Sequence, residues 1–316
     1  MAPPPIAALD LGSNTFRLML AGKAEEKRPH PWDDKRVFQE LPRLAEGLAP
    51  GGPLAPSALN RAWEALDSFA AEIRASKAGR VLAGATMAAR LAADGPAFLA
   101  ETARRYGGET RLLTGEEEAR LTAAGVLTGL APSPPEALIF DIGGRSTEFI
   151  TVTGGTPGRS LSLDLGVVGL TEAYLEAPAR PGQLEAVALA TRAALSAADL
   201  SFVQADPVLV GTAGTVTTMA ALLLGLKTYD PDLVNNSRLA RPALAGLLAE
   251  LAPLSEARRV EKYGLHPRRA DALPAGLALA LEIMDHFRRT ELTVSDNGLL
   301  EGLWLAAAGL GPDSTV

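Results

Sequence analysis

Two stretches of this chain align without gaps, Asp10-Leu-Gly-Ser-Asn-Thr-Phe-Arg-Leu18 and Asp141-Ile-Gly-Gly-Arg-Ser-Thr-Glu-Phe149. In each, an apolar run ends at an aspartate, a glycine-containing turn follows, and a second apolar run begins. This pattern is typical of a β-hairpin, because glycine permits a tight turn between two strands. Two copies, each opening a half of similar size, predict a duplicated α/β protein with a central cleft.

The remaining sequence continues this α/β pattern. The Pro-rich segment Ala131-Pro-Ser-Pro-Pro135 interrupts it midway, and 316 residues suffice for two domains of roughly 150 residues. We expect domain I over residues 1–130 and domain II over residues 131–299. Apolar periodicity predicts helices at Ser57–Ser76, Pro96–Tyr106 and Gly115–Gly129, and strands at Ile6–Leu9, Phe16–Leu20, Val37–Leu41, Arg80–Ala83, Ala137–Phe140, Phe149–Val152, Ser160–Leu165, Val208–Val210 and Leu292–Val294.

Composition excludes several classes of site. The absence of cysteine rules out disulfides, Cys-ligated metals and a thiol nucleophile, and three scattered histidines do not suggest a His-rich metal site. A formal net charge of −7 argues against general nucleic-acid binding. We found neither an export signal nor an apolar run of the roughly 18–20 residues that span a bilayer, so we expect a cytoplasmic protein without a membrane partner.

The two turns carry the chemistry of a phosphate site. Their glycines allow close approach of a ligand, their backbone N–H groups can form an anion-binding concavity, and serine and threonine add hydroxyl donors. Asp10 and Asp141, each at a strand end, suit Mg²⁺ bound beside phosphate. The alternative interpretation is a pair of hairpin turns without a ligand. The segment Gly211-Thr-Ala-Gly-Thr215 precedes an apolar helix and favours either a further phosphate contact or a plain strand-to-helix turn.

The acidic run Glu116-Glu-Glu118 separates into different roles. Thr114 and Glu117 have capping-box spacing, and Glu116 suits the positive end of the helix dipole. Glu118, about 100° around the helix from Glu117, is left as a candidate general base or as a solvated first-turn residue.

These motifs together resemble the exopolyphosphatase/guanosine pentaphosphate phosphatase (Ppx/GppA) family of the actin-like ATPase superfamily. The matching segments, in family order, are Asp10–Arg17, Ala85-Thr-Met-Ala-Ala-Arg90, Gly115–Leu121, Asp141–Glu148, Gly211–Thr215, Tyr229-Asp-Pro231, Arg269-Ala-Asp271 and Val294-Ser-Asp-Asn-Gly298.

The resemblance implies two actin-like, ribonuclease H-like domains with the active site between them, and a C-terminal helix at about residues 300–312 that packs back on domain I. It also implies Mg²⁺-dependent removal of terminal phosphate. It places the catalytic roles on Glu118, Asp141 and Glu148, and together with the turn chemistry above it gives Asp10 and Asp141 as metal ligands. The phosphate-binding candidates are Ser13, Asn14, Thr15, Arg90, Gly143, Gly144, Arg145, Ser146, Gly214 and Thr215.

Three positions depart from the family pattern. Arg145 replaces a third glycine of the second turn, and Gly169 and Leu300 stand where the family usually has arginine. Two possible anion contacts are therefore expected to be missing, while Arg145 either adds phosphate-binding charge or crowds the turn. The long family members also carry a C-terminal helical extension that is not expected here, which favours short polyphosphates over long ones.

We therefore expect a phosphatase acting on inorganic polyphosphate, with pppGpp of the stringent response as a further substrate. The different-class alternative is a non-catalytic protein that binds pppGpp or polyphosphate. An actin-like ATPase or kinase is the third interpretation. A homodimer is left open.

Overall fold

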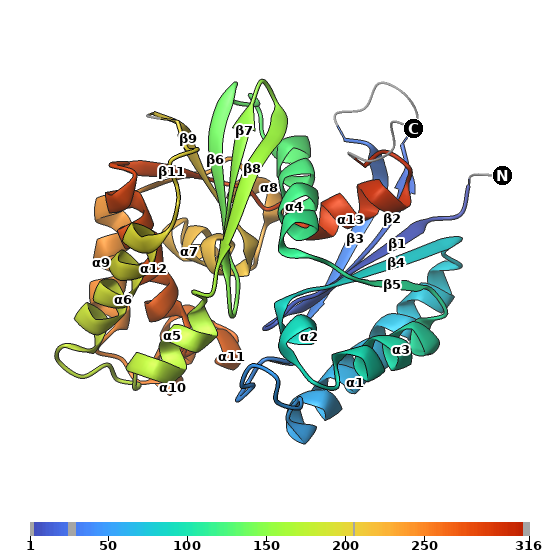
Figure 1. Cartoon of the computed structure of the whole chain (residues 1–316), viewed down its shortest axis with the longest axis horizontal. Helices are drawn as coiled ribbons and strands as arrows, with labels where there is room; N and C mark the ends of the chain where they lie inside the picture. Colours follow the sequence, from blue (N-terminus) through green and yellow to red (C-terminus); the bar gives the residue numbers. More distant parts are fainter. Residues whose placement is uncertain (1–2, 25–29, 205, 312–316) are drawn as a thin grey trace. The chain divides into compact units, whose positions relative to one another are not determined.

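The computed structural model describes residues 3–24, 30–204 and 206–311. It divides into two compact units, each with its own β-sheet. Unit 1 comprises the described residues of Met1–Thr128 and Asn297–Val316, and unit 2 is Gly129–Asp296. Figure 1 follows the chain by colour, so that the last helix, in red, is seen beside the blue strands of unit 1.

Unit 1 is built on a five-stranded sheet of order β3-β2-β1-β4-β5. Its strands are β1 (Ile6–Leu11), β2 (Phe16–Lys23), β3 (Trp32–Glu40), β4 (Arg80–Ala85) and β5 (Glu109–Leu112), and its helices are α1 (Pro56–Ser76), α2 (Met87–Leu91), α3 (Gly95–Tyr106), α4 (Gly115–Gly129) and α13 (Leu299–Ala307).

Alternate side chains of β1 enter different cores of unit 1, as the pleat of a strand requires. Leu9 and Leu11 join the core under α1 and α3, whereas Ala8 joins the core that contains Leu300 and Trp304 of α13. Helices therefore cover both faces of this sheet (Figure 1).

Unit 2 contains a six-stranded sheet of order β10-β11-β9-β6-β7-β8. Its strands are β6 (Glu136–Ile142), β7 (Thr147–Thr153), β8 (Thr156–Leu163), β9 (Val208–Thr212), β10 (Arg238–Ala240) and β11 (Glu291–Val294), and its helices are α5 (Val167–Tyr174), α6 (Gln183–Ala197), α7 (Ala213–Leu223), α8 (Pro231–Val234), α9 (Arg241–Leu251), α10 (Glu256–Tyr263), α11 (Pro267–Ala270) and α12 (Leu273–His286).

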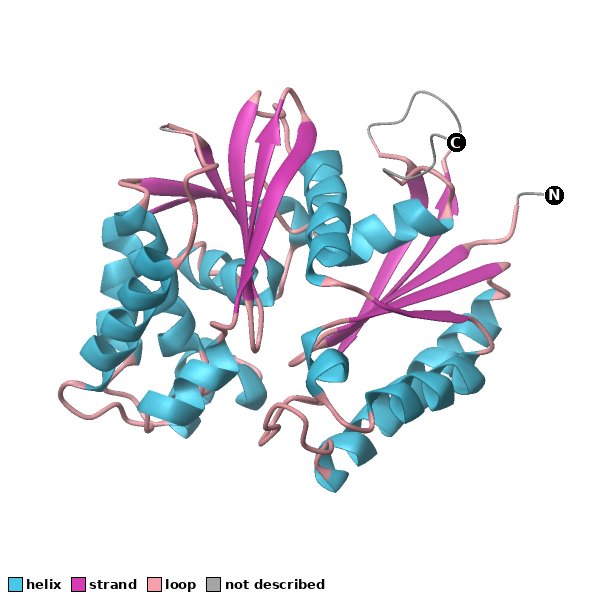
Figure 2. Ribbon diagram, in the orientation of Figure 1, coloured by secondary structure: helices cyan, strands magenta, loops and turns pink. Residues whose placement is uncertain are grey.

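Helix α12 forms the centre of the unit 2 core. Its side chains from Leu273 to Leu281 are all buried, so it is apolar on every side rather than along one stripe. The strands, helices and loops of both units are distinguished by colour in Figure 2.

The two sheets share one topology. β1 pairs antiparallel with β2 and parallel with β4, and β6 pairs antiparallel with β7 and parallel with β9. The order β3-β2-β1-β4-β5 thus corresponds to β8-β7-β6-β9-β11, with β10 added at the edge. The duplicated α/β fold expected from the two aligned hairpins is present.

Several element boundaries differ from the sequence prediction; strand β3, for example, begins at Trp32 and not at Val37, and two further differences lie in unit 2. The turn between β7 and β8 uses only Gly154 and Gly155, both at positive φ, and Pro157 already pairs with Val152 in the sheet. Helix α7 begins at Ala213, so Gly214 and Thr215 lie inside its first turn. Among the residues that the structure describes, no helix combines the length and the apolar character needed to cross a membrane.

Candidate active site

The two aligned turns, turn 1 (Asp10–Thr15) and turn 2 (Asp141–Ser146), have the same backbone hydrogen bond. The Gly12 N–H donates to the Thr15 carbonyl at 3.1 Å, and the Gly143 N–H donates to the Ser146 carbonyl at 2.9 Å. A Cβ atom at these glycines would lie 2.9 and 3.1 Å from the same two carbonyl oxygens. Both turns therefore require glycine because a backbone carbonyl approaches the Cα atom closely.

The strand register gives the two aspartates different neighbours. Asp10 lies opposite Arg17 on β2, whereas Asp141 lies opposite Glu148 on β7. Directly opposed residues of an antiparallel pair have Cβ atoms about 4.5–5.5 Å apart, so their charges interact. Turn 1 therefore combines opposite charges, and turn 2 combines two carboxylates.

Asp10 belongs to a group of charges in unit 1. Burial raises the pKa of Asp10 to about 7, the Arg17 charge opposes this increase, and the Glu301 charge adds to it. Burial also acts against ionisation of Glu301, yet the nearby Lys35 and Arg17 charges and its hydrogen bonds lower the pKa of this carboxyl overall. Lys35 Nζ lies 2.8 Å from Glu301 Oε1, and the Gly298 N–H donates to Glu301 Oε2 at 2.7 Å. Glu301 and Lys35 were not among the predicted site residues.

Turn 1 is supported by two other segments of unit 1. The Ala88 N–H of α2 donates to Ser13 Oγ at 3.2 Å. The Arg43 N–H donates to the Asn14 carbonyl and the Ala45 N–H to the Ser13 carbonyl, both at 3.0 Å. Arg43 was not predicted as part of the site. Its backbone has a positive φ of 52°, which the sequence does not indicate because this conformation is uncommon for residues other than glycine.

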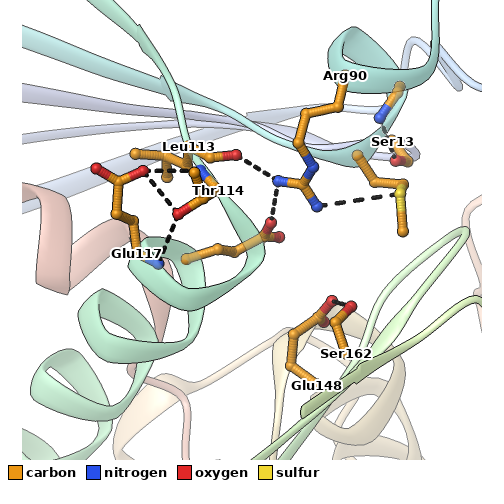
Figure 3. A network of polar contacts seen from close by, with 10 residues as sticks. Ser13, Arg90, Leu113, Thr114, Glu117, Glu148 and Ser162 are labelled. Carbon is orange, nitrogen blue, oxygen red and sulfur yellow. Dashed lines mark hydrogen bonds and ion pairs between the residues drawn. The ribbon is translucent and has the colours of Figure 1, made fainter. Parts of the chain in front are cut away.

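Arg90 and Glu118 form an ion pair, although they lie 28 residues apart in the chain. Arg90 Nη1 lies 2.9 Å from Glu118 Oε2 and also donates to the Leu113 carbonyl (Figure 3). Only 9% of Glu118 is exposed. The Glu118 carboxylate is therefore buried and ion-paired on the first turn of α4. It is not the solvated first-turn residue that was the alternative to a general base.

Glu117 has the capping role predicted from its spacing. Its Oε2 accepts the Thr114 N–H at 2.8 Å, and the Glu117 N–H donates to Thr114 Oγ1 at 3.2 Å (Figure 3). The hydrogen bonds from Thr114 lower the pKa of the Glu117 carboxyl. The capping prediction is confirmed, and Glu117 and Glu118 have separate functions in the fold.

In unit 2, Glu148 is held beside the strand end that carries Asp141. Only 3% of Glu148 is exposed, and Ser162 Oγ of β8 donates to its Oε1 at 2.8 Å (Figure 3). Two neighbouring carboxylates match the oxygen ligands that Mg²⁺ prefers. Within the described residues, no group of three or more His, Cys, Asp or Glu side chains could hold a metal ion. The paired carboxyl groups of Asp141 and Glu148 are of the type that Mg²⁺ takes when phosphate oxygens and water complete its shell.

The start of α7 lies close to turn 2 and to an arginine. Thr215 Oγ1 donates to the Ile142 carbonyl at 3.1 Å, and Thr218 Oγ1 donates to the Gly214 carbonyl at 2.6 Å. Arg269 Nη1 in turn donates to Thr218 Oγ1 at 2.8 Å, and a Cβ atom at Gly214 would lie 3.0 Å from Arg269 Nη2. Arg269 is thus a further cation at this end of unit 2 that the list of predicted site residues omitted, although its motif was noticed.

The structure places the three departures from the family pattern in different surroundings. Leu300 is fully buried in the apolar core around α13, and the loss of an anion contact at this position stays a prediction. A Cβ atom at Gly169 would lie 3.5 Å from Arg145 Nη1, and Arg145 Nη2 lies 3.1 Å from Glu172 Oε2. Gly169 and Arg145 are therefore neighbours.

The predicted site residues of each unit lie in a few groups. In unit 1, turn 1 carries Asp10, Ser13, Asn14 and Thr15, and the ion pair joins Arg90 to Glu118. In unit 2, the β6–β7 hairpin carries Asp141, Gly143, Gly144, Arg145, Ser146 and Glu148, and Thr215 beside Gly214 is hydrogen-bonded to the strand end.

Comparisons with known proteins agree with this architecture. Residues 39–309 match the model of the Ppx/GppA phosphatase family. The chain is 31% identical to exopolyphosphatase 2 of Mycobacterium tuberculosis, in an alignment that covers 98% of this chain and 100% of that relative.

Solved structures show the same fold. The crystal structure of the Aquifex aeolicus member of the Ppx/GppA family is 26% identical, with a TM-score of 0.80 over 96% of this chain and 97% of that one. An exopolyphosphatase from Cytophaga hutchinsonii, 21% identical, has a TM-score of 0.87 over 97% of this chain and 99% of that one.

Proposed function

Because the chain belongs to the Ppx/GppA phosphatase family, we propose that it is an exopolyphosphatase, which hydrolyses the terminal phosphoanhydride of inorganic polyphosphate. The near-full-length similarity to exopolyphosphatase 2 supports the choice of substrate. Hydrolysis of pppGpp to ppGpp is a second activity of the same chemistry, since it also removes a terminal phosphate from an anhydride.

The observation that carries this proposal is the ion pair of Arg90 with Glu118. Phosphoryl transfer requires positioning and neutralisation of charge more than covalent chemistry by the protein. A guanidinium can bind phosphate oxygens, and a carboxylate next to it can orient and deprotonate the attacking water. Glu117 forms the cap at the helix start, whereas Glu118 on the same turn contacts Arg90.

We assign the following roles in the reaction. Glu118 of unit 1 accepts a proton from water as the water oxygen bonds to the terminal phosphorus. The role that we assign to Glu148 of unit 2 is that of an assisting carboxylate. The bond from phosphorus to the bridging oxygen breaks, which releases orthophosphate and a chain shortened by one residue. Within unit 1, the N–H and hydroxyl groups of turn 1 and the Arg90 guanidinium are the donors to phosphate oxygens, and within unit 2 the N–H and hydroxyl groups of turn 2 are.

Asp10 in unit 1 and Asp141 in unit 2 are each a candidate ligand that would hold Mg²⁺. Glu148 opposite Asp141 gives the position in unit 2 more negative charge than the position in unit 1, where Arg17 lies opposite Asp10. When bound, the ion would neutralise charge on the terminal phosphates of the substrate.

The test is release of orthophosphate from polyphosphate, pppGpp and ATP, with Mg²⁺ and with the ion removed by chelation. We expect Mg²⁺-dependent release from polyphosphate. Tight binding of polyphosphate or pppGpp without release would instead establish the non-catalytic binding protein. Release from ATP alone would indicate an actin-like ATPase.

A further inference from the structure

Arg145 occupies the centre of turn 2 without changing its backbone. It aligns with Asn14 of turn 1, and the closing hydrogen bond is 2.9 Å in turn 2 against 3.1 Å in turn 1. The long side chain therefore does not open or distort the turn that the proposed function uses for phosphate.

The Arg145 side chain lies along α5, where two glycines provide space for it. A Cβ atom at Gly166 would lie 2.4 Å from the Arg145 backbone nitrogen, and one at Gly169 would lie 3.5 Å from Nη1. Glu172, one helical turn after Gly169, lies 3.1 Å from Nη2. Gly166 thus accommodates the backbone of residue 145, the guanidinium packs next to Gly169, and Glu172 forms an ion pair with it.

The first N–H groups of α5 are already used by turn 2. The Val167 N–H donates to the Gly143 carbonyl at 3.0 Å and the Val168 N–H to the Gly144 carbonyl at 2.8 Å. Because these two N–H groups donate to carbonyl groups of turn 2, they are not available to bind an anion at the start of α5. A positive charge at this side of turn 2 has to come from a side chain, and Arg145 with 20% of its side chain exposed supplies one.

We infer that Arg145, packed against Gly169 and paired with Glu172, is the cation of turn 2 that binds a condensed phosphate. The inference rests on the proposed function for the identity of the substrate. It assigns Arg145 to binding of the phosphate chain and leaves activation of water to Glu118. Loss of the guanidinium therefore raises KM and Kd while kcat changes little.

The experiment measures binding of inorganic tripolyphosphate by calorimetry and hydrolysis of the same compound by phosphate release. Arg145→Gln is expected to raise both Kd and KM by about tenfold to a hundredfold, as for loss of a charge-assisted hydrogen bond, with an unchanged melting temperature. Arg145→Lys keeps the charge and is expected to retain most of the affinity. An unchanged Kd in Arg145→Gln, or a higher kcat/KM, would overturn the inference.

Glu172→Gln is the matched control for a purely structural role. If Arg145 served only to pair with Glu172, this variant would weaken tripolyphosphate binding as much as Arg145→Gln does, and that result would refute the inference. We expect its Kd to equal or fall below that of the wild type, because a competing carboxylate has been removed.

The double variant Arg145→Gly/Gly169→Arg moves the guanidinium from the turn to the helix, where the new side chain starts 3.5 Å from the original Nη1 position. We expect it to bind tripolyphosphate more tightly than Arg145→Gly alone, and equal weak binding by both would contradict the placement. Calorimetry also separates this inference from the proposed function. A protein that binds tripolyphosphate through Arg145 without releasing phosphate would retain the inference and refute the enzyme.

Discussion

The β1–β2 hairpin of unit 1 and the β6–β7 hairpin of unit 2 have the same backbone and different charges. Each closes with a glycine N–H bonded to a carbonyl three residues later. The strand partner of the aspartate is Arg17 in unit 1 and Glu148 in unit 2. One hairpin therefore carries balanced charges, and the other carries a pair of carboxylates.

This difference indicates how a duplicated scaffold acquires two roles. The glycines are constrained in both copies by carbonyl contacts of about 3 Å, so the turns keep their shape. The residue opposite the aspartate, Arg17 in one hairpin and Glu148 in the other, differs in charge while the turn keeps its shape. The comparison suggests that turn 1 is mainly a phosphate-binding turn and that turn 2 is mainly a cation-binding turn with an added arginine.

The largest effect is expected at Glu118, which we propose as the general base. Glu118→Gln keeps the shape and a hydrogen-bonding oxygen for Arg90 but cannot accept the proton. We expect kcat to fall by about 10²–10⁴-fold with Kd for tripolyphosphate nearly unchanged. Steady-state phosphate release and calorimetry measure the two quantities, and a rate near that of the wild type would reject this assignment.

The next effect compares the two aspartates directly. Asp141→Asn removes a carboxylate from a like-charged pair, and we expect the Mg²⁺ concentration for half-maximal activity to rise by at least about tenfold. Asp10→Asn is expected to cause a smaller rise, since Arg17 already balances this charge. Mg²⁺ titrations of both variants measure the difference. A larger shift in Asp10→Asn would reverse the roles of the two turns.

The sequence predicted the units better than their edges. Both hairpins, the helix Gly115–Gly129 and the family follow from apolar runs, glycine turns and motif order, which are local signals, and the comparisons confirm the fold and family. The short strands β5 and β10 were missed. They are four and three residues long and mostly exposed, which is too short for a strand pattern to be recognised in the sequence.

The predicted site residues were chosen by type and motif, but their contacts were beyond the reach of the sequence. The pairing of Arg90 with Glu118 and the position of Lys35 beside Glu301 depend on the packing of distant elements. The burial of Leu300 in the core around α13 also depends on the packing of this helix, which the motif alone does not show.

A pH-dependent effect on stability tests the charge balance of turn 1. Burial raises the pKa of Asp10 from 3.8 to about 7, so between these values the folded state holds a proton that the unfolded state has lost. This proton stabilises the fold at low pH, and its contribution is lost as the pH rises through about 7.

We therefore expect the wild type to lose stability relative to Asp10→Asn between pH 4 and pH 7, by up to about 1.4 kcal/mol for each pH unit. Urea unfolding at four pH values with divalent cations chelated measures the difference. Glu116→Gln, at an exposed position, is the control for a general change of charge. A constant difference between wild type and Asp10→Asn would show that Asp10 is ionised throughout this range.

The smallest effect is expected at Glu117. If Glu118 is the general base, Glu117 contributes only to the stability of helix α4. Glu117→Ala removes the acceptor for the Thr114 N–H at the start of α4, and loss of such a contact costs on the order of 1 kcal/mol. We expect the urea midpoint to fall while kcat and KM for tripolyphosphate stay within about twofold of the wild type. A change of twofold is far below the loss of about 10²–10⁴-fold that removal of a general base causes. Glu117→Gln keeps an acceptor oxygen at the capping position, so it is expected to restore most of the stability. If Glu117→Ala instead abolished turnover at an unchanged urea midpoint, the two adjacent glutamates would have to exchange roles, and the water-activating group would lie on the exposed side of α4, away from Arg90.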